Sequence, residues 1–213
     1  MSGRGRPRQF DRRAALRTAM LLFWEHGYAG TSMSMLTASM GITSTSLYAA
    51  FGSKDELFRE AIRLYDSPDS SPTERGLREP SARGAVEAAL RGNADAYVDP
   101  DTPPGCMVVL AGLNLGSGQE HIGRFLAQNR REVRARISAR IQRGVDEGDL
   151  PASSDRDALA AYVTTVMHGL SILARDGCGR DEAHQVVDSA MVGWDALIRQ
   201  YEEGTVAARQ PAE

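Results

Sequence analysis

Cysteine and long apolar stretches are scarce in this sequence. Only Cys106 and Cys178 occur among 213 residues, too few for a disulfide framework, so we expect two buried thiols in a reducing compartment, with redox sensing as the alternative. The longest apolar run, from Cys106 to Leu113, is far shorter than the ~20 residues that cross a bilayer. No apolar stretch of ~7–15 residues follows the basic N-terminus, so we expect no signal peptide, no membrane partner and a cytoplasmic location.

Signatures of catalysis and metal binding are also missing. The chain has no His-x-x-x-His pair, no nucleophile elbow and no Walker loop. The glycine-rich stretch GSGQEH follows an apolar helical segment rather than a strand, and the spacing of His121, His168, His184 and Cys178 matches no known ligand pattern. We therefore expect no enzyme activity, no catalytic residues, no metal and no cofactor.

Charge is distributed unevenly. The first 64 residues carry nine Lys and Arg against five Asp and Glu, a net +4, whereas the remainder carries sixteen against twenty-three, a net −7. A basic front and an acidic back indicate that the front part meets a polyanion.

Strand-type alternation is absent, and apolar residues follow helical spacing almost throughout, which predicts an all-α fold. Residues 66–81 are rich in proline, serine and glycine, and we interpret them as a linker or mobile loop. Five arginines share one face of the helix expected over 120–147, and we interpret that face as solvated. They are Arg130, Arg134, Arg136, Arg140 and Arg143. The expected helices span 11–27, 31–41, 43–52, 53–65, 82–97, 106–115, 120–147, 155–175 and 181–203.

Two short helices around a tight glycine turn lie within 31–58. Leu36, Ile42, Leu47 and Phe51 are spaced to face a common core. The start of the second helix is left small, polar and outward, as in a helix-turn-helix that inserts this end into the ~12 Å major groove. The candidates for base-edge contact are Ser44, Thr45 and Ser46.

This segment, over about 14–58, resembles the DNA-binding part of the TetR/AcrR family of bacterial transcription regulators. It departs from the family at Thr37, where an alanine is usual, so the Thr37 hydroxyl needs a partner. The matching positions are Gly27-Tyr28, Thr31-Ser32, Met40-Gly41-Ile42, Leu47-Tyr48, Phe51, Ser53-Lys54 and Asp55-Glu56-Leu57.

The resemblance gives further residues a role in DNA binding. Thr31 and Tyr48 resemble positions that contact phosphates, with a core aromatic as the alternative for Tyr48. Lys54 lies at a helix N-terminus, where the helix dipole favours a phosphate, with a solvated lysine as the alternative.

The basic arm RGRP resembles an AT-hook core, whose arginines enter a narrow minor groove. The alternative is a tail that attracts DNA nonspecifically. The arm residues expected to bind DNA are Arg4, Arg6 and Arg8.

The resemblance implies a ligand-binding and dimerisation region after about residue 60. The last two helices have wide apolar faces, which could pair across a twofold axis or pack only within the protomer. The residues expected at the dimer interface are Leu170, Val187, Met191, Trp194, Leu197, Ile198 and Tyr201. The expected lining of a cavity for a hydrophobic small molecule is Tyr97, Met107, Leu110, Asn114, Phe125, Tyr162, Val166, Met167 and His168.

These features predict a ligand-responsive repressor that binds a palindromic double-stranded operator as a homodimer. Ligand binding would tilt the helix over 54–65 and change the separation of the two reading heads. The alternatives are a ligand-independent nucleoid-type protein for A·T-rich DNA and, further off, a helical enzyme. We expect a flexible arm over 1–10, a three-helix DNA-binding domain over 11–58, a helical ligand-binding and dimerisation domain over 59–203 and a flexible tail over 204–213.

Overall fold

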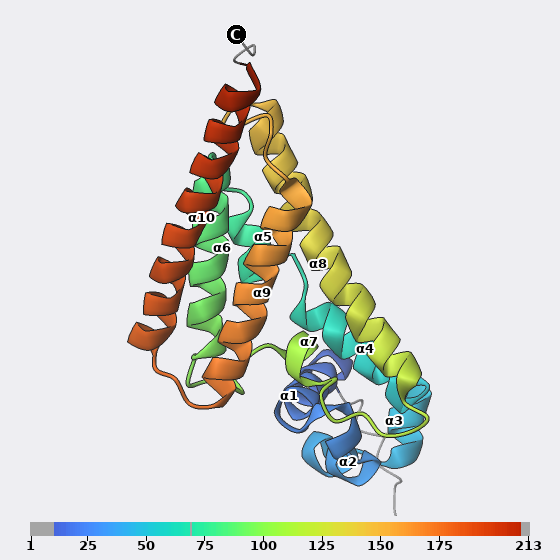
Figure 1. Ribbon diagram of the computed structural model, residues 1–213. Helices are drawn as coiled ribbons and strands as arrows, with labels where there is room; N and C mark the ends of the chain where they lie inside the picture. The colour runs from blue at the N-terminus through green and yellow to red at the C-terminus, as the bar shows by residue number, and fades with distance from the viewer. Residues whose placement is uncertain (1–10, 69, 210–213) are drawn as a thin grey trace, which may run out of the picture.

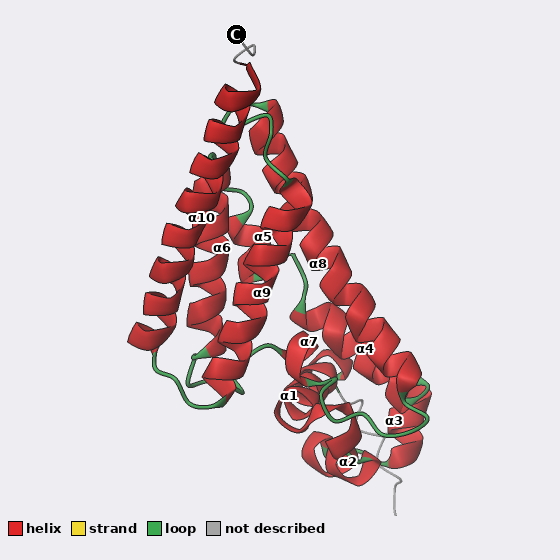
Figure 2. Ribbon diagram, viewed as in Figure 1, coloured by secondary structure: helices red, strands yellow, loops and turns green. Residues whose placement is uncertain are grey.

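All regular secondary structure in residues 11–68 and 70–209, which the computed structural model describes, is helical (Figures 1 and 2). This confirms the all-α fold. The helices are α1 (Arg12–Gly30), α2 (Met33–Met40), α3 (Ser44–Phe51), α4 (Lys54–Tyr65), α5 (Pro72–Gly76), α6 (Ala82–Tyr97), α7 (Met107–Leu110), α8 (Glu120–Asp146), α9 (Arg156–Arg175) and α10 (Arg180–Arg209).

The first helix begins and breaks where the sequence predicts. The Asp11 side chain accepts hydrogen bonds from the backbone N–H groups of Arg13 and Ala14, which caps α1. Gly27 has a φ of 71° and interrupts the helical geometry inside α1, a conformation that glycine adopts at little cost. The last turn of α1 therefore changes direction just before α2.

Arg12 ties the N-terminal helices together. Its guanidinium donates to both carboxylate oxygens of Glu60 in α4 at 2.8 Å and to the carbonyl oxygen of Ala50 in α3 at 3.2 Å. The same group lies 4.5 Å from the ring centroid of Phe51. These contacts fix α3 relative to α1 and α4.

The remaining helices form an elongated bundle above this group (Figure 1). The long helix α8 begins beside α4 and runs to the opposite end, while α6 packs against α9 and α10. Helix α9 has the length and hydropathy of a membrane-crossing segment, but Leu159, Val163 and Leu170 are buried in the protein core. It is therefore a core helix of the bundle.

The segment interpreted as a linker is folded, so that interpretation was wrong. Ser71 caps α5, and Thr73 and Gly76 in α5 are buried. A Cβ atom at Gly76 would lie 2.3 Å from the backbone nitrogen of Ala89 in α6. The missing side chain allows α5 to contact the α6 backbone, and this tertiary contact stabilises a helix too short to persist alone.

The solvated face expected on α8 is only partly present, which corrects a second interpretation: Arg134 and Arg143 are exposed, whereas Arg130 and Arg136 are partly buried and Arg140 is buried. Arg136 pairs with Asp66 at 3.1 Å and with Glu74 at 2.5 Å. Arg140 is buried and donates to the carbonyl oxygens of Glu79 and Pro80. This part of α8 therefore holds the 66–81 segment against the bundle.

Two helix bounds also differ from the prediction. Helix α7 covers only Met107–Leu110 because the chain turns away toward Gly116. Helix α10 continues to Arg209, beyond the expected end at 203.

Candidate nucleic-acid interface and ligand cavity

The turn between α2 and α3 is built by local capping. The Ser32 side chain accepts from Met35 N–H at the start of α2. Gly41 adopts the left-handed conformation (φ 65°, ψ 32°) and ends α2. The Thr43 side chain accepts from Ser46 N–H at the start of α3, and Thr37 finds its partner in the carbonyl oxygen of Met33 at 3.0 Å. These caps set the angle at which α3 leaves the turn.

The first turn of α3 presents small hydroxyls to solvent. Ser44 and Thr45 are exposed, whereas Ser46 is partly buried and its hydroxyl lies 3.0 Å from the Thr43 hydroxyl. Leu47 and Phe51 on the opposite face are buried. Ser44 and Thr45 are thus the two candidates with hydroxyls open to an approaching base edge.

Tyr48 and Lys54 lie beside this turn in sequence and differ in exposure. Tyr48 is 49% exposed, so its ring is not a core aromatic. Lys54 is the first residue of α4, and its Nζ lies 4.3 Å from the ring centroid of Tyr28. Burial lowers the pKa of Lys54, and the nearby Asp55 partly counters that shift. The ring therefore positions the ammonium group at the helix start.

Thr31 does not lie where a phosphate contact requires it. Its side chain is fully buried, and its hydroxyl donates to the carbonyl oxygens of Gly27 at 2.7 Å and Leu22 at 3.2 Å. The Thr31 hydroxyl thus stabilises the end of α1, which corrects that expectation. Ser32 and Ser34 are exposed at the start of α2, and the N-cap pattern at Ser32 was the sequence signal that could have indicated them.

The arm residues Arg4, Arg6 and Arg8 lie outside the described residues. Their place in the minor groove stays a prediction.

Asp55 joins the N-terminal helices to the start of α8. One of its carboxylate oxygens accepts a hydrogen bond from the Tyr28 hydroxyl in α1, and the other lies 2.6 Å from Nε2 of His121 in α8. The Tyr28 hydrogen bond holds the pKa of Asp55 below its usual range, and His121 contributes in the same direction. A carboxylate thus sits at the junction between α1, α4 and α8.

Aromatic contacts reinforce this junction. The ring centroids of Phe58 and Phe125 are 6.4 Å apart, and the Arg59 guanidinium lies 4.4 Å from the Phe125 ring centroid. Phe125, expected in the ligand cavity, therefore belongs to the contact between α4 and α8.

An Asp55→Asn substitution should reduce the acid sensitivity of folding. Because the pKa of Asp55 is depressed in the folded protein, its stabilising contribution is present above the unfolded pKa of ~3.9 and is lost as the pH falls through the folded value. The effect is modest because the side chain is 37% exposed. Urea unfolding at ~pH 7 and ~pH 3 measures it; an equal loss of stability in wild type and variant would contradict the prediction.

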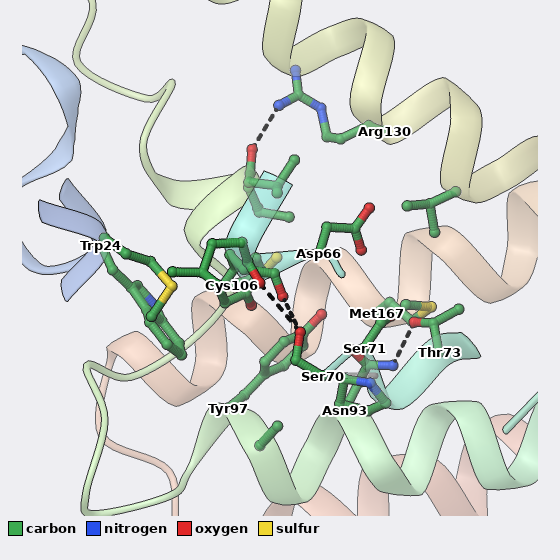
Figure 3. A pocket seen from close by; sticks show the side chains of 18 of the residues that line it. Trp24, Asp66, Ser70, Ser71, Thr73, Asn93, Tyr97, Cys106, Arg130 and Met167 are labelled. Carbon is green, nitrogen blue, oxygen red and sulfur yellow. Dashed lines mark hydrogen bonds between the residues drawn. The ribbon is translucent and has the colours of Figure 1, made fainter. Parts of the chain in front are cut away.

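A cavity of about 340 Å³ lies between the N-terminal helices and the bundle (Figure 3). Helix α1 contributes Trp24, whose indole nitrogen donates to the Gly105 carbonyl oxygen at 3.0 Å. In Figure 3, Tyr97, Met167 and Arg130 approach the same space from α6, α9 and α8. One wall of the cavity is therefore part of the helix-turn-helix domain itself.

The polar groups of the cavity have different partners. Asn93 donates to the Thr73 hydroxyl at 2.8 Å, and Asp66 pairs with Arg136. Burial lowers the pKa of His168, and the positive charge of Arg130 lowers it further. The Cys106 thiol is free, and burial raises the pKa of the neighbouring Tyr65 and Tyr97 hydroxyls, with Cys106 contributing in the same direction.

The structure brings only part of the predicted lining into the cavity. Tyr97, Met167 and His168 line it. Asn114 is exposed in the turn after α7, and the Tyr162 hydroxyl donates to the Ala190 carbonyl oxygen in α10, so both expectations are corrected. Three apolar candidates pack in the core without lining the cavity, namely Met107, Leu110 and Val166. Sequence reasoning missed Trp24 and Arg130, since spacing within one helix does not show which other helix covers it.

The predicted dimer residues lie mainly inside the protomer. Leu170, Val187, Met191 and Trp194 are buried in the core of the single chain and cannot face a partner. The remaining three are partly buried against that core: Leu197, Ile198 and Tyr201. Among the described side chains of α9 and α10, the large apolar groups left exposed are Ile172, at 46%, and Val192, at 69%.

Comparison with known proteins agrees with this architecture. The model of the bacterial regulatory proteins of the TetR family matches residues 15–61, and that of the tetracycline-repressor-like C-terminal domain matches residues 82–185. The repressor ComR of Escherichia coli K12 is 30% identical over 198 residues, which cover 92% of this chain and 94% of ComR. The repressor BdcR of the same organism is 29% identical, over 81% of this chain and 83% of BdcR.

A solved structure is similar over the full fold. It contains a cysteine-substituted form of the TetR-family regulator CifR with 26-bp double-strand operator DNA. It superimposes with a TM-score of 0.85 at 40% identity, over 89% of this chain and all of the CifR chain. On the family matches, the helix-turn-helix and the helical C-terminal domain, the chain belongs to the TetR family of bacterial transcription regulators.

Proposed function

We propose that this protein is a ligand-responsive transcriptional repressor that binds a palindromic DNA operator as a homodimer. The observation that carries the proposal is the first turn of α3, where Ser44 and Thr45 project from a capped helix start while Leu47 and Phe51 anchor the other face. The similarity to the repressors ComR and BdcR and to operator-bound CifR supports it. We further propose that it acts in the cytoplasm and has no enzymatic activity of its own.

Phosphate contacts would position α3 in the major groove. Tyr48 offers an exposed hydroxyl, and Lys54 offers an ammonium group at the N-terminus of α4, where the helix dipole also favours an anion. The exposed Ser32 replaces Thr31 as the hydroxyl at the start of α2. Because short hydroxyls read bases weakly, Arg4, Arg6 and Arg8 would add minor-groove contacts that favour A·T-rich flanks.

The dimer would form through the exposed faces of α9 and α10. Thr165, Gly169 and Ile172 share the outward face of α9, and Ser189 and Val192 share that of α10. No atom lies within 4 Å of a Cβ built at Gly169, so this face is open to a second copy. Two copies of α3 one DNA turn apart, ~34–36 Å, would read the two halves of a palindrome.

Signal transfer would pass through α4. We propose residues 11–58 as the DNA-binding domain, so α4 continues from it into the ligand-binding domain, and its Leu64 and Tyr65 line the cavity. A ligand that prefers one position of α4 changes the separation of the two α3 helices of the dimer. A coupling of ~1–3 kcal/mol between ligand binding and DNA binding changes operator affinity by ~5–150-fold. The Asp55 junction with His121 is the contact that such a shift must change.

To test the proposal, operator fragments are selected from the source genome, and the affinity of the protein for them is measured at a series of salt concentrations. The plot of log affinity against log salt should become shallower by ~0.9 for each phosphate that the protein no longer neutralises. For Lys54→Gln we therefore expect a slope about 1.8 smaller in a dimer. The control Arg143→Gln removes a charge that is exposed at the far end of α8, and its slope should equal that of wild type.

Footprinting of the selected fragments gives the contradicting outcome. A protected palindrome is the expected result. Diffuse protection over A·T tracts, with an unchanged salt slope for Lys54→Gln, would instead indicate a nucleoid-type binder.

A further inference from the structure

Arg130 is a cation without an acidic partner in the cavity wall. It is partly buried, and its one hydrogen bond in the described part of the chain goes to the carbonyl oxygen of Val108 at 2.9 Å. A guanidinium carries five N–H donors. Burial lowers the pKa of Arg130, which is the expected response of a cation removed from water without compensation.

Two neighbouring arginines of α8 have partners that can be compared with those of Arg130. Arg136 has two carboxylate partners, Asp66 and Glu74, and Arg140 donates to two backbone carbonyls. No ion pair joins Arg130 to a carboxylate among residues 11–68 and 70–209. Arg140 also lacks a carboxylate partner, but neither it nor Arg136 lines the cavity, whereas Arg130 does. A ligand in the cavity can therefore supply the counter-charge that Arg130 lacks.

The charge of the side chains that line the cavity also favours an anionic ligand. Among the described lining residues, Asp66 is the acidic side chain, and Arg136 already neutralises it. Arginines line the cavity from three directions, namely Arg13 and Arg17 of α1, Arg75 of α5 and Arg130 of α8. Such a concentration of like charge raises the local concentration of small anions.

The rest of the wall is apolar and aromatic. Trp24, Tyr65 and Tyr97 contribute rings, and Met20 and Met167 contribute flexible side chains. A volume of about 340 Å³ lies near the lower end of the ~300–1,000 Å³ range of small-molecule sites. The cavity therefore suits a compact molecule with one anionic end and one apolar body.

We propose that the cavity binds a small aromatic or alicyclic carboxylate, whose carboxylate group pairs with Arg130 and whose apolar body packs between Trp24, Tyr97 and Met167. The planar guanidinium matches a carboxylate through two parallel hydrogen bonds. This inference rests on the proposed ligand-responsive function and names the chemical class of its ligand.

The position of Arg130 also links the ligand to the DNA-binding domain. The hydrogen bond from Arg130 to Val108 joins α8 to α7, and α7 packs against α1. A carboxylate that draws the guanidinium away from Val108 weakens that link. Ligand binding would thus change the packing of α1, the helix that carries Trp24.

Benzoate, phenylacetate and cyclohexanecarboxylate serve as probes, and their primary amides are neutral molecules of nearly the same shape. Titration calorimetry on the full-length protein without DNA measures binding. We expect at least one acid to bind with a Kd below about 1 mM and its amide to bind about 10–100-fold more weakly. Inorganic phosphate is included to identify a site that binds any anion; it should bind more weakly than the best acid because it lacks an apolar body.

The variant Arg130→Gln should weaken the best acid by about 10–100-fold and leave its amide unchanged. The matched control is Arg134→Gln, one turn further along α8, whose side chain donates to the Asp157 carbonyl oxygen and does not line the cavity. Circular dichroism and the melting temperature without ligand establish that both variants fold.

Equal binding of acids and amides, full retention of acid binding by Arg130→Gln, or no acid binding below about 1 mM would each overturn the inference. Operator binding by wild type and Arg130→Gln without any acid is measured in parallel. Intact operator binding with no acid binding would refute the ligand class alone, whereas absence of operator binding in the wild type would refute the proposed function.

Discussion

A Val192→Arg substitution is expected to convert the dimer into monomers and to lower operator affinity by about 100–10,000-fold. Val192 is 69% exposed on α10 and lies on the same face as Ser189. In a twofold interface the substitution would place an arginine from each copy in one apolar contact, where neither has a partner. A monomer then binds a single half-site without the gain in effective concentration that two linked reading heads provide.

Sedimentation velocity measures the oligomeric state, and fluorescence anisotropy with the selected operator measures affinity. The control Gln128→Arg adds the same charge at an exposed position of α8, outside the proposed interface of α9 and α10, and should leave both quantities unchanged. A Val192→Arg protein that remains dimeric would show that the exposed face of α10 is not the interface.

Truncation of Trp194 is expected to have the largest effect on stability. Trp194 is 1% exposed and belongs to the core of the single protomer. Removal of a buried indole costs about 3–5 kcal/mol, because transfer free energy is lost and a cavity remains. Trp194→Ala should therefore lower the free energy of unfolding by that amount even in the monomeric Val192→Arg background.

The monomeric background separates the two possible locations of Trp194. Urea unfolding of Val192→Arg and of the double variant compares them without any contribution from dimer dissociation. The control Gln200→Ala changes an exposed position on the same helix and should stay within about 0.5 kcal/mol. If Trp194→Ala also changed the free energy of unfolding of the monomer by no more than about 0.5 kcal/mol, the indole would lie in the interface and not in the protomer core.

Local signals predicted the helix-turn-helix well. The caps at Asp11, Thr43 and Ser53 and the left-handed Gly41 act over three or four residues, so the sequence contains all that determines them. The family resemblance then supplied the function of the segment.

Long-range packing explains what sequence reasoning missed. Spacing showed that Val187 and Trp194 share a face of α10, but not whether that face meets the protomer core or a second copy. Composition suggested a loop around Gly76, because the neighbour that stabilises α5 is the backbone of α6, which lies later in the sequence. The solvated face predicted on α8 was wrong at Arg130, Arg136 and Arg140 for the same reason, since the 66–81 segment and α7 cover these residues.

Trp24 makes the DNA-binding domain part of the wall of the ligand cavity. Its indole closes the cavity and donates to the Gly105 carbonyl oxygen from a helix that also supports α3. A chimera could be made by exchanging the N-terminal helices for those of a related regulator. In this protein such an exchange would replace Met20 and Trp24 in the cavity wall, so a new operator specificity would be acquired together with an altered ligand preference.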